Sequence, residues 1–452
     1  MTPLVSVYIT NYNYGSFIKE AIESVLNQFL NDFELIIIDD GSTDDSKDII
    51  EQYTKNSLVS IIYQQNKGLN ITNNVAMRAA KGKYLMRLDA DDFLHPNALK
   101  AMSDRMESDA QLGLVFPDYF YIDSNGEILG EEKRHDFEND VKLLDQPAHG
   151  ACTMIRLDYL KEVGGYNESY NCQDGYELWV KFTKNYQIAN VSESLFYYRQ
   201  HGSNLTGNET KILGTRAQIN ADFIQQEAIN TSTLAIIPIR GGEQDLAFKT
   251  IAGENLLEVK IKQVLKSKNI KHLVVSSPDL EVNTLLKKYK SEVKIEFHHR
   301  EKAEARYNQS LNPTISEIVR DQIAKNLAFE AILVLTLEFP LVEAYKIDDV
   351  VNTMMVFGSD SIIGVRADNS VFYQHHGDGL HPILERDMHT KLEREALFKQ
   401  VGGTNAVTKS AFLKSSEMIT GKVGHIVMDQ RSSIGLFTKL DWEIAERLAI
   451  MQ

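Results

Sequence analysis

Cysteine is scarce in this chain of 452 residues, which contains only Cys152 and Cys172. Two cysteines exclude a disulfide framework and a zinc site built from several thiolates, and they favour a reducing compartment. Neither cysteine has an evident base partner in the sequence, so we expect both to pack as apolar side chains. Stability must then come from a hydrophobic core, for which the 43% content of hydrophobic residues is sufficient.

Basic residues are also fewer than acidic residues. The chain has 48 lysine and arginine residues against 63 aspartate and glutamate residues, which gives a formal net charge of -15. A surface of this sign repels phosphate backbones and anionic lipids, so we expect no nucleic-acid partner. A local basic pocket for a nucleotide is still compatible with this charge.

Long hydrophobic runs are missing as well. The most apolar stretch, residues 328–342, is interrupted by Glu330 and Glu338 and is too short to cross a bilayer. The first ten residues carry no basic segment and lead directly into the polar sequence NYNYG, unlike a signal peptide. We therefore expect a cytoplasmic protein without an integral membrane segment, and peripheral association with a membrane stays open.

Short apolar segments alternate with longer amphipathic ones along the chain, which is typical of βαβ units around a mostly parallel sheet. A polar stretch over residues 206–233 separates two such series. We therefore expect an α/β protein with two Rossmann-like nucleotide-binding domains, residues 1–230 with a C-terminal helical linker and residues 231–452. Strands are predicted at residues 4–10, 33–39, 59–65, 83–89, 234–239, 271–277, 293–299, 331–337, 361–366 and 424–429.

Carboxylates cluster where the predicted strands end, at the edge where open α/β sheets bind ligands. The sequence LDADD places Asp89, Asp91 and Asp92 directly after a strand. Hard oxygen ligands in this arrangement suit a divalent cation that substrate phosphates complete. A solvated acidic turn or helix cap is the alternative, because aspartate-rich turns are common.

Three further motifs accompany LDADD in the first half. DDGS ends a strand at residues 39–42, QDGYELW at residues 173–179 places an acid beside an aromatic helix start, and YYRQH occupies residues 197–201. In this order the motifs resemble the family 2 glycosyltransferases of GT-A fold, and the resemblance covers residues 3–205. Each motif is weak alone, but their order, spacing and strand context agree.

The resemblance implies a nucleotide-sugar donor and a set of residues that bind it. Thr10 and Tyr12 would line the nucleotide pocket, and Asp40 would accept the base N–H. Asn74 lies in the run leading to the DXD motif, although Asn73 replaces the usual arginine before it.

The same resemblance implies a divalent metal, Mn²⁺ or Mg²⁺. Asp89 and Asp91 form the DXD motif and would contact the donor, while Asp91, Asp92 and His201 would hold the metal. Such a metal offsets the charge that develops on a diphosphate leaving group. A structural role is the alternative for His201, as for any lone histidine in a loop.

Asp174 matches the family's general base and stands five residues before Trp179. It would take the proton from an acceptor hydroxyl that attacks the opposite face of the sugar, so the anomeric centre would invert. The alternative is an N-cap for a helix beginning near Tyr176.

The second half resembles the cytidylyltransferases that activate sialic acid and related acidic sugars as CMP derivatives, over residues 234–449. The resemblance rests on the glycine turn AIIPIRGG, on KHLVVSSPD, on HHREKAEARYNQSLNPTISEIV and on the ending VGHIVMDQRSSIGLFTKLDWEIAE. Arg240 and Lys249 match the family's phosphate loop, and Arg300 matches a sugar-site arginine.

The departures from that family fall where its chemistry needs charge. Glu243 and Asp245 stand where a triphosphate would lie, and Gly435 and Phe437 replace two metal-binding acids. Val342 also replaces an arginine of the family. We therefore expect a domain that keeps the fold, has lost nucleotidyl transfer, and serves for binding, docking or homodimer formation.

Together these motifs predict a metal-dependent inverting glycosyltransferase. It would move a sugar from a nucleotide-sugar, with UDP favoured, to a glycan or lipid-linked glycan acceptor in surface polysaccharide or glycoconjugate synthesis. Two alternatives stay open: a bifunctional chain that also makes a CMP-activated acidic sugar, and a non-catalytic scaffold of polysaccharide assembly.

Overall fold

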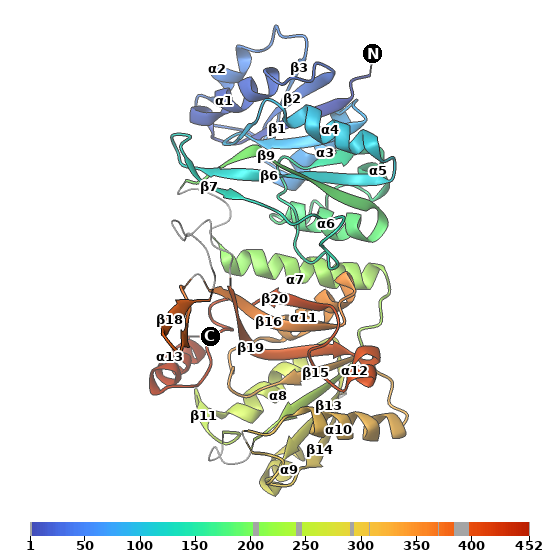
Figure 1. Cartoon of the computed structure of the whole chain (residues 1–452), viewed down its shortest axis with the longest axis vertical. Helices are drawn as coiled ribbons and strands as arrows, with labels where there is room; N and C mark the ends of the chain where they lie inside the picture. The colour runs from blue at the N-terminus through green and yellow to red at the C-terminus, as the bar shows by residue number, and fades with distance from the viewer. Residues whose placement is uncertain are drawn as a thin grey trace. The chain divides into compact units, whose positions relative to one another are not determined.

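The computed structural model describes residues 2–201, 208–240, 246–289, 293–306, 308–368, 370–383 and 397–451. Its contacts divide the chain into two compact units (Figure 1). The first unit comprises Met1–Asn208 with Val371–Glu395, and the second comprises Glu209–Ser370 with Ala396–Gln452.

The first unit is built on a nine-stranded mixed sheet in the order β3-β2-β1-β4-β8-β6-β9-β5, with β7 paired to β6. Strands β3, β2, β1 and β4 run parallel, whereas β8 is antiparallel to both of its neighbours. The strands are β1 (Val5–Asn11), β2 (Phe33–Asp39), β3 (Val59–Tyr63), β4 (Tyr84–Asp89), β5 (Phe93–Leu94), β6 (Leu112–Ile122), β7 (Ile128–Glu132), β8 (Met154–Arg156) and β9 (Gln187–Arg199).

Amphipathic helices connect these strands. They are α1 (Gly15–Leu26), α2 (Ser46–Glu51), α3 (Leu69–Ala79), α4 (Ala98–Ser108), α5 (Leu157–Glu162) and α6 (Asp174–Asn185). On α1 the apolar spacing predicted by the sequence is found, because Ile18, Ala21, Ile22 and Val25 are all buried. A two-stranded ribbon of β17 (Tyr373–His376) and β18 (Gly379–Pro382) is also assigned to this unit.

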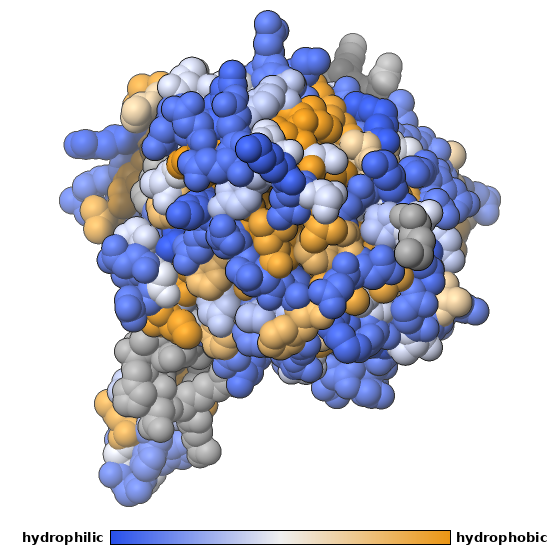
Figure 2. All heavy atoms as spheres, turned by 90° about the horizontal axis from the view of Figure 1, so that it is seen from above, coloured by the Kyte–Doolittle hydropathy of each residue, from blue (hydrophilic) through white to orange (hydrophobic). Residues whose placement is uncertain are grey.

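Cys152 lies in the hydrophobic core of the first unit, where burial raises the pKa of its thiol. Cys152 forms no disulfide, and the expectation that it is a packing residue is confirmed. Seen from the viewpoint of Figure 2, the surface is mainly hydrophilic, with apolar side chains in smaller groups.

The second unit has a seven-stranded sheet in the order β14-β13-β10-β15-β19-β16-β20. Its strands are β10 (Thr233–Pro238), β13 (Ile270–Ser277), β14 (Lys294–His299), β15 (Ala331–Leu335), β16 (Ser361–Asp368), β19 (Leu397–Thr408) and β20 (Val423–Val427), with a small ribbon of β11 (Thr250–Ile251) and β12 (Glu254–Asn255). Its helices are α7 (Glu209–Gln226), α8 (Leu256–Lys266), α9 (Leu280–Leu286), α10 (Asn312–Ala324), α11 (Ala344–Phe357), α12 (Lys409–Ser415) and α13 (Lys439–Ile450).

Both faces of the second sheet are covered, as a parallel sheet with near-continuous apolar strands requires. Along β10, Ala235 and Ile237 belong to one core cluster, while Leu234 and Ile236 belong to another. All the strands predicted from the apolar runs are found. Strand β19 was not predicted, because residues 398–400 near its start are exposed and Gly402 and Gly403 interrupt its pattern.

Helix α7 belongs to the second unit, whereas we expected it to be a linker attached to the first domain. It packs against α11, and its buried Asn220 Nδ2 donates hydrogen bonds of 3.0 Å to both Asp349 Oδ1 and Thr353 Oγ1. The division therefore falls at residue 209 rather than near residue 230. None of the helices within the described ranges combines the length and apolar composition needed to cross a membrane.

A fragment of residues 209–452 should unfold at higher temperature than a fragment of residues 231–452. Loss of α7 removes its buried apolar side chains and leaves Asp349 of α11 without its asparagine donor, which we expect to cost at least about 3 kcal/mol. Thermal and urea unfolding of the two fragments measures this difference. Asn220→Ala in the longer fragment should show a smaller loss, and equal midpoints for all three would contradict the assignment of α7.

Candidate active site

The carboxyl ends of β1, β2 and β4 lie side by side and carry the first predicted site residues. The parallel register pairs Thr10 with Asp89 and Asn11 with Asp39. Thr10 Oγ1 donates a hydrogen bond of 3.0 Å to Asp89 Oδ1. Tyr12 follows in the loop after β1 and is 46% exposed. Thr10 and Asp89 therefore meet at the edge where open α/β sheets bind ligands.

Asp40 is buried, and its carboxylate is hydrogen-bonded by the protein itself. Oδ1 accepts from the Lys67 N–H at 2.9 Å and from Gln64 Nε2 at 2.7 Å, and Oδ2 accepts from the Gly68 N–H at 2.9 Å. Gly68 precedes α3 at a φ of 88°, a left-handed conformation that favours glycine. Asp40 thus fixes the start of α3, and its contact with a nucleotide base stays a prediction.

Asn73 and Asn74 on α3 are also buried. Asn74 Nδ2 donates to Tyr166 O at 2.8 Å and to Glu168 Oε1 at 2.9 Å, and its Oδ1 accepts from the Tyr166 N–H at 3.0 Å. These bonds hold the loop between α5 and α6, so the expected donor contact of Asn74 stays a prediction. Asn73 Nδ2 lies 3.3 Å from Asp174 Oδ2 and donates to it.

The three acids of LDADD have different surroundings. Asp91 Oδ2 lies 2.8 Å from His201 Nε2, so two of the three predicted metal ligands are in contact. Asp92 Oδ1 accepts a hydrogen bond of 2.9 Å from the Arg199 N–H, whereas its buried Oδ2 has no partner among the described residues. Burial and then the neighbouring acids raise the pKa values of Asp91 and Asp92 above the ordinary range.

The imidazole of His201 is held by two aromatic rings next to α1. Its ring centroid lies 5.7 Å from that of Phe17, in a stacked arrangement, and 5.8 Å from that of Tyr14. Burial and the charge of Asp91 raise the pKa of Tyr14, which therefore keeps its phenol proton. The packing fixes the ring that faces Asp91, so the structural and ligand roles of His201 are compatible.

A divalent cation fits this acidic cluster. Within the part of the chain that the structure describes, no group of three or more acidic, histidine or cysteine side chains is arranged so that together they could hold a metal ion. Mg²⁺-like cations do not require such a group, because one or two carboxylates commonly hold them and substrate phosphates complete the shell. Asp92 Oδ2 has no partner among the described residues, and the raised pKa of Asp92 indicates that its ionised form lacks a counter-charge, which a cation would supply.

Arg87 was not predicted as a site residue, yet its buried guanidinium joins two residues that were. Arg87 Nη1 contacts Asp174 Oδ2, and Arg87 Nε lies 3.1 Å from Asp89 Oδ1. Burial alone would lower the pKa of Arg87, but Asp174 and Asp89 raise it above the ordinary value, so the group stays charged. An arginine inside the apolar run YLMRL was the available signal, because a buried charge needs a partner.

Asp174 is the first residue of α6, and its carboxylate bonds Arg87 and Asn73. The residue before α6 is Gln173, and its side chain makes no capping hydrogen bond. The helix therefore begins earlier than expected, and the N-cap alternative for Asp174 is not the arrangement found. Instead, the start of α6 carries a buried, ion-paired acid to the sheet edge.

An aromatic cluster stands next to this ion pair. The His149 ring centroid lies 4.7 Å from that of Tyr198, 5.3 Å from that of Phe196 and 5.6 Å from that of Tyr119. Burial lowers the pKa of His149, and its Nδ1 accepts a hydrogen bond of 3.2 Å from the Ala151 N–H. The neutral ring consequently carries its proton on Nε2 and can donate from there.

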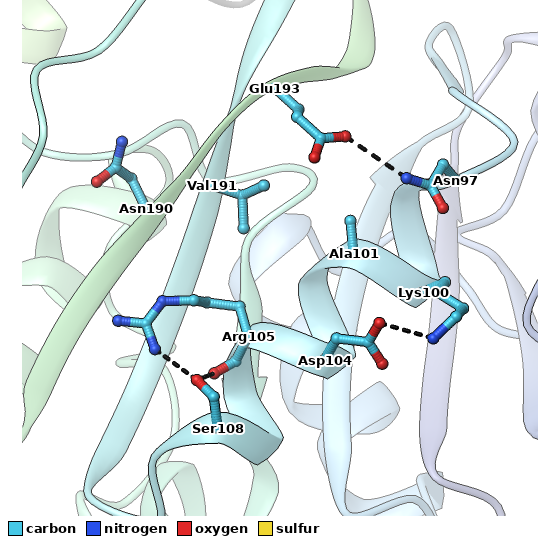
Figure 3. A pocket seen from close by; sticks show the side chains of 9 residues that line it. All are labelled: Asn97, Lys100, Ala101, Asp104, Arg105, Ser108, Asn190, Val191 and Glu193. Atoms are coloured by element: carbon cyan, nitrogen blue, oxygen red, sulfur yellow. Dashed lines mark hydrogen bonds and ion pairs between the residues drawn. The ribbon is translucent and has the colours of Figure 1, made fainter.

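A hollow of about 470 Å³ lies elsewhere on the first unit, between α4 and β9 (Figure 3). Exposed ion pairs and hydrogen bonds join its lining side chains, among them Lys100 with Asp104 and Asn97 with Glu193. None of the predicted site residues lines it. It is therefore separate from the acidic cluster.

The comparison with known sequences assigns the family. Residues 6–164 match the profile of glycosyl transferase family 2. An uncharacterized glycosyltransferase of Methanocaldococcus jannaschii is 32% identical over 206 residues, which are 44% of this chain and 71% of that protein. The chain belongs to glycosyltransferase family 2. Chondroitin synthase of Escherichia coli is also 32% identical over 203 residues, 45% of this chain, but the match spans only 30% of that enzyme.

Solved structures of glycosyltransferases also align with about half of the chain. S. aureus TarS with UDP-GlcNAc is 18% identical, with a TM-score of 0.43 over 49% of this chain and 66% of that one. The mannosyltransferase PcManGT of Pyrobaculum calidifontis with GDP-Man and Mn²⁺ is 18% identical, with a TM-score of 0.39 over 50% of this chain and 65% of that one.

Asp91→Asn should abolish metal-dependent binding of a nucleoside diphosphate to the first unit, because it removes the acid that faces His201. We expect the affinity for UDP in the presence of Mn²⁺ to fall by at least about tenfold in calorimetry. Asp104→Asn, on the exposed surface of α4, is the matched control and should bind as the wild type does. Unchanged Mn²⁺ and UDP affinity in Asp91→Asn would remove the metal assignment.

Proposed function

We propose that the first unit is a metal-dependent inverting glycosyltransferase. It moves a sugar from a nucleotide-sugar donor, with UDP favoured, to a glycan or lipid-linked glycan acceptor in surface polysaccharide or glycoconjugate synthesis. The observation that carries this proposal is the convergence at one sheet edge of the DXD acids with Asp174, joined by Arg87. Sequence similarity to the chondroitin synthase and the hyaluronan synthase of Pasteurella multocida supports a glycan acceptor.

Asp91, Asp92 and His201 are the residues that would hold the cation, with Asp89 directed to the donor. When bound, the cation offsets the negative charge that develops on the departing diphosphate. Thr10 keeps Asp89 in place through its hydrogen bond, and the rings of Tyr14 and Phe17 keep His201 in place. Cation and donor would thus meet side chains that are already oriented.

Asp174 supplies the base. As an acceptor hydroxyl attacks the anomeric carbon, its proton passes to the Asp174 carboxylate while the bond to the diphosphate oxygen breaks, which inverts the anomeric centre. Burial of Asp174 excludes bulk water from its carboxylate, and the ion pair with Arg87 holds the carboxylate in place before the acceptor binds. The aromatic cluster around His149 offers apolar ring faces beside this carboxylate for an acceptor sugar.

Asp174→Asn should keep donor affinity near the wild-type value while transfer slows by at least about a hundredfold. The substitution also breaks a buried ion pair, so a lower unfolding temperature is expected. Transfer should therefore be measured with radiolabelled UDP-sugars and glycan acceptors well below the unfolding transition of the variant. A near-normal rate would leave Asp174 with a structural role only.

The non-catalytic scaffold is the less favoured alternative. A scaffold has no need for two acids held by one buried arginine, nor for a buried carboxylate oxygen on Asp92 that has no partner among the described residues. Mn²⁺-dependent hydrolysis of a sugar nucleotide by the full chain distinguishes the two, because a scaffold would release no nucleoside diphosphate.

For the second unit we propose a cytidylyltransferase-like fold without nucleotidyl transfer, serving for binding, docking or homodimer formation. Phe437 packs edge-on against Phe339 with ring centroids 5.7 Å apart, and Gly435 lies beside both rings. No carboxylate is therefore present at either position where the family has a metal-binding acid. Glu243 and Asp245 lie outside the described residues.

The bifunctional alternative would require the second unit to join CTP to an acidic sugar. We expect residues 209–452, which include α7, to release no pyrophosphate above background from CTP, Mg²⁺ and a panel of nonulosonic acids. The reason is the missing acid pair at Gly435 and Phe437, which leaves no protein ligand for the cation there. Steady release that Arg240→Ala abolishes would restore the bifunctional reading.

A further inference from the structure

We propose that Arg87 is a positioning residue that holds the base Asp174 and the donor-site acid Asp89 in one fixed arrangement. The inference rests on the proposed function of the first unit. Arg87 itself touches neither the acceptor hydroxyl nor the sugar in this assignment, and it acts through the two carboxylates.

The first support is the geometry of the guanidinium. One side of it contacts Asp174 Oδ2 through Nη1, and the other lies 3.1 Å from Asp89 Oδ1 through Nε and 3.4 Å from Asp89 Oδ2 through Nη2. A planar fork of this kind fixes two carboxylates at once, whereas an ammonium acts as a single point charge. Asp89 belongs to the donor side and Asp174 to the acceptor side, so one group sets the separation between them.

The second support is the way the surrounding chain confines Arg87. Its backbone carbonyl accepts a hydrogen bond of 2.8 Å from the Cys152 N–H, and its side chain is only 7% exposed. A Cβ atom on Gly150 would lie 2.8 Å from Arg87 Nη2, and one on Gly175 would lie 3.1 Å from Gly150 Cα. The loop at Gly150 therefore lies directly against the guanidinium of Arg87, and the start of α6 lies against that loop.

The third support is the identity of residue 73. Asn73 on α3 is buried and donates a hydrogen bond to Asp174. Its Oδ1 in turn accepts a hydrogen bond of 3.1 Å from Tyr8 Oη. The side of Asp174 that faces α3 is thus neutral, and the positive charge paired with Asp174 is supplied by β4.

The test compares Arg87→Met, Arg87→Lys and Asp174→Asn with the double variant Arg87→Met/Asp174→Asn. Each full-length protein is assayed for transfer at saturating UDP-sugar, for the KM of the acceptor, and for UDP affinity with Mn²⁺. Arg156→Met is the control, because Arg156 is a partly buried arginine of the same sheet that packs on Tyr84. Thermal unfolding of every variant is recorded.

We expect Arg87→Met to lower kcat by at least about tenfold with little change in the KM of the acceptor, since a misplaced base slows the chemical step. Arg87→Lys should recover part of that loss. The double variant should transfer no more slowly than Asp174→Asn alone, because a positioning residue has nothing left to position. Arg156→Met should lower stability without this loss of kcat.

A wild-type kcat in Arg87→Met while Asp174→Asn is slow would overturn this inference and leave the proposed function standing. The positioning role would also be overturned if the loss of kcat in the double variant equalled the product of the losses in the two single variants. A normal transfer rate in Asp174→Asn would overturn both the positioning role of Arg87 and the proposed base function of Asp174. If Arg87→Met does not fold, Arg87→Lys keeps the buried charge, and a wild-type kcat in that variant with both carboxylates intact would count against positioning by the planar fork.

Discussion

The burial of negative charge is the constraint on which the first unit depends. Four carboxylates, those of Asp89, Asp91, Asp92 and Asp174, come together at one sheet edge, and three of them are almost fully buried. Their mutual repulsion has to be compensated, because unpaired buried charge is among the most destabilising features a fold can contain.

Two arginines take part in this compensation, each from a strand. Arg87 on β4 serves Asp89 and Asp174, while Arg199 at the end of β9 donates its backbone N–H to Asp92 and its Nε to Asp91 O at 2.7 Å. β4 lies in the interior of the sheet, whereas β9 pairs with β6 and with the short edge strand β5. Asp92 Oδ2 is left without a hydrogen-bond partner among the described residues.

The sequence predicted the strand ends well, and it predicted the contacts between them poorly. Thr10 and Asp89 could be placed at one edge because parallel strands finish together, whereas Asp174 was assigned from the family resemblance. Arg87 could not be assigned, because a counter-ion is chosen by tertiary approach and not by spacing along the chain. The same holds for Asn74, whose amide turned out to bind the loop at Tyr166.

In the second unit the apolar runs of the sequence predicted the parallel strands, because a strand that is buried on both faces has apolar residues at nearly every position. Strand β19 was missed for the opposite reason. Phe398, Lys399 and Gln400 near its start are exposed, and two glycines at positive φ break its alternation, so only its pairing with β15 and β16 reveals it. Helix α7 was assigned to the wrong neighbour because its helical pattern does not say which unit it packs against.

The close approach of Gly150 and Gly175 has a consequence for how this site can change in evolution. Neither glycine contacts a substrate in the proposed mechanism, yet a methyl group on Gly150 would reach the guanidinium of Arg87. We therefore expect substitutions at residues 87, 150, 174 and 175 to depend on one another, because a larger side chain at one position requires a smaller or displaced one at another. Lineages that replace Gly150 should also differ at Arg87, and the base of such enzymes would be held by different chemistry.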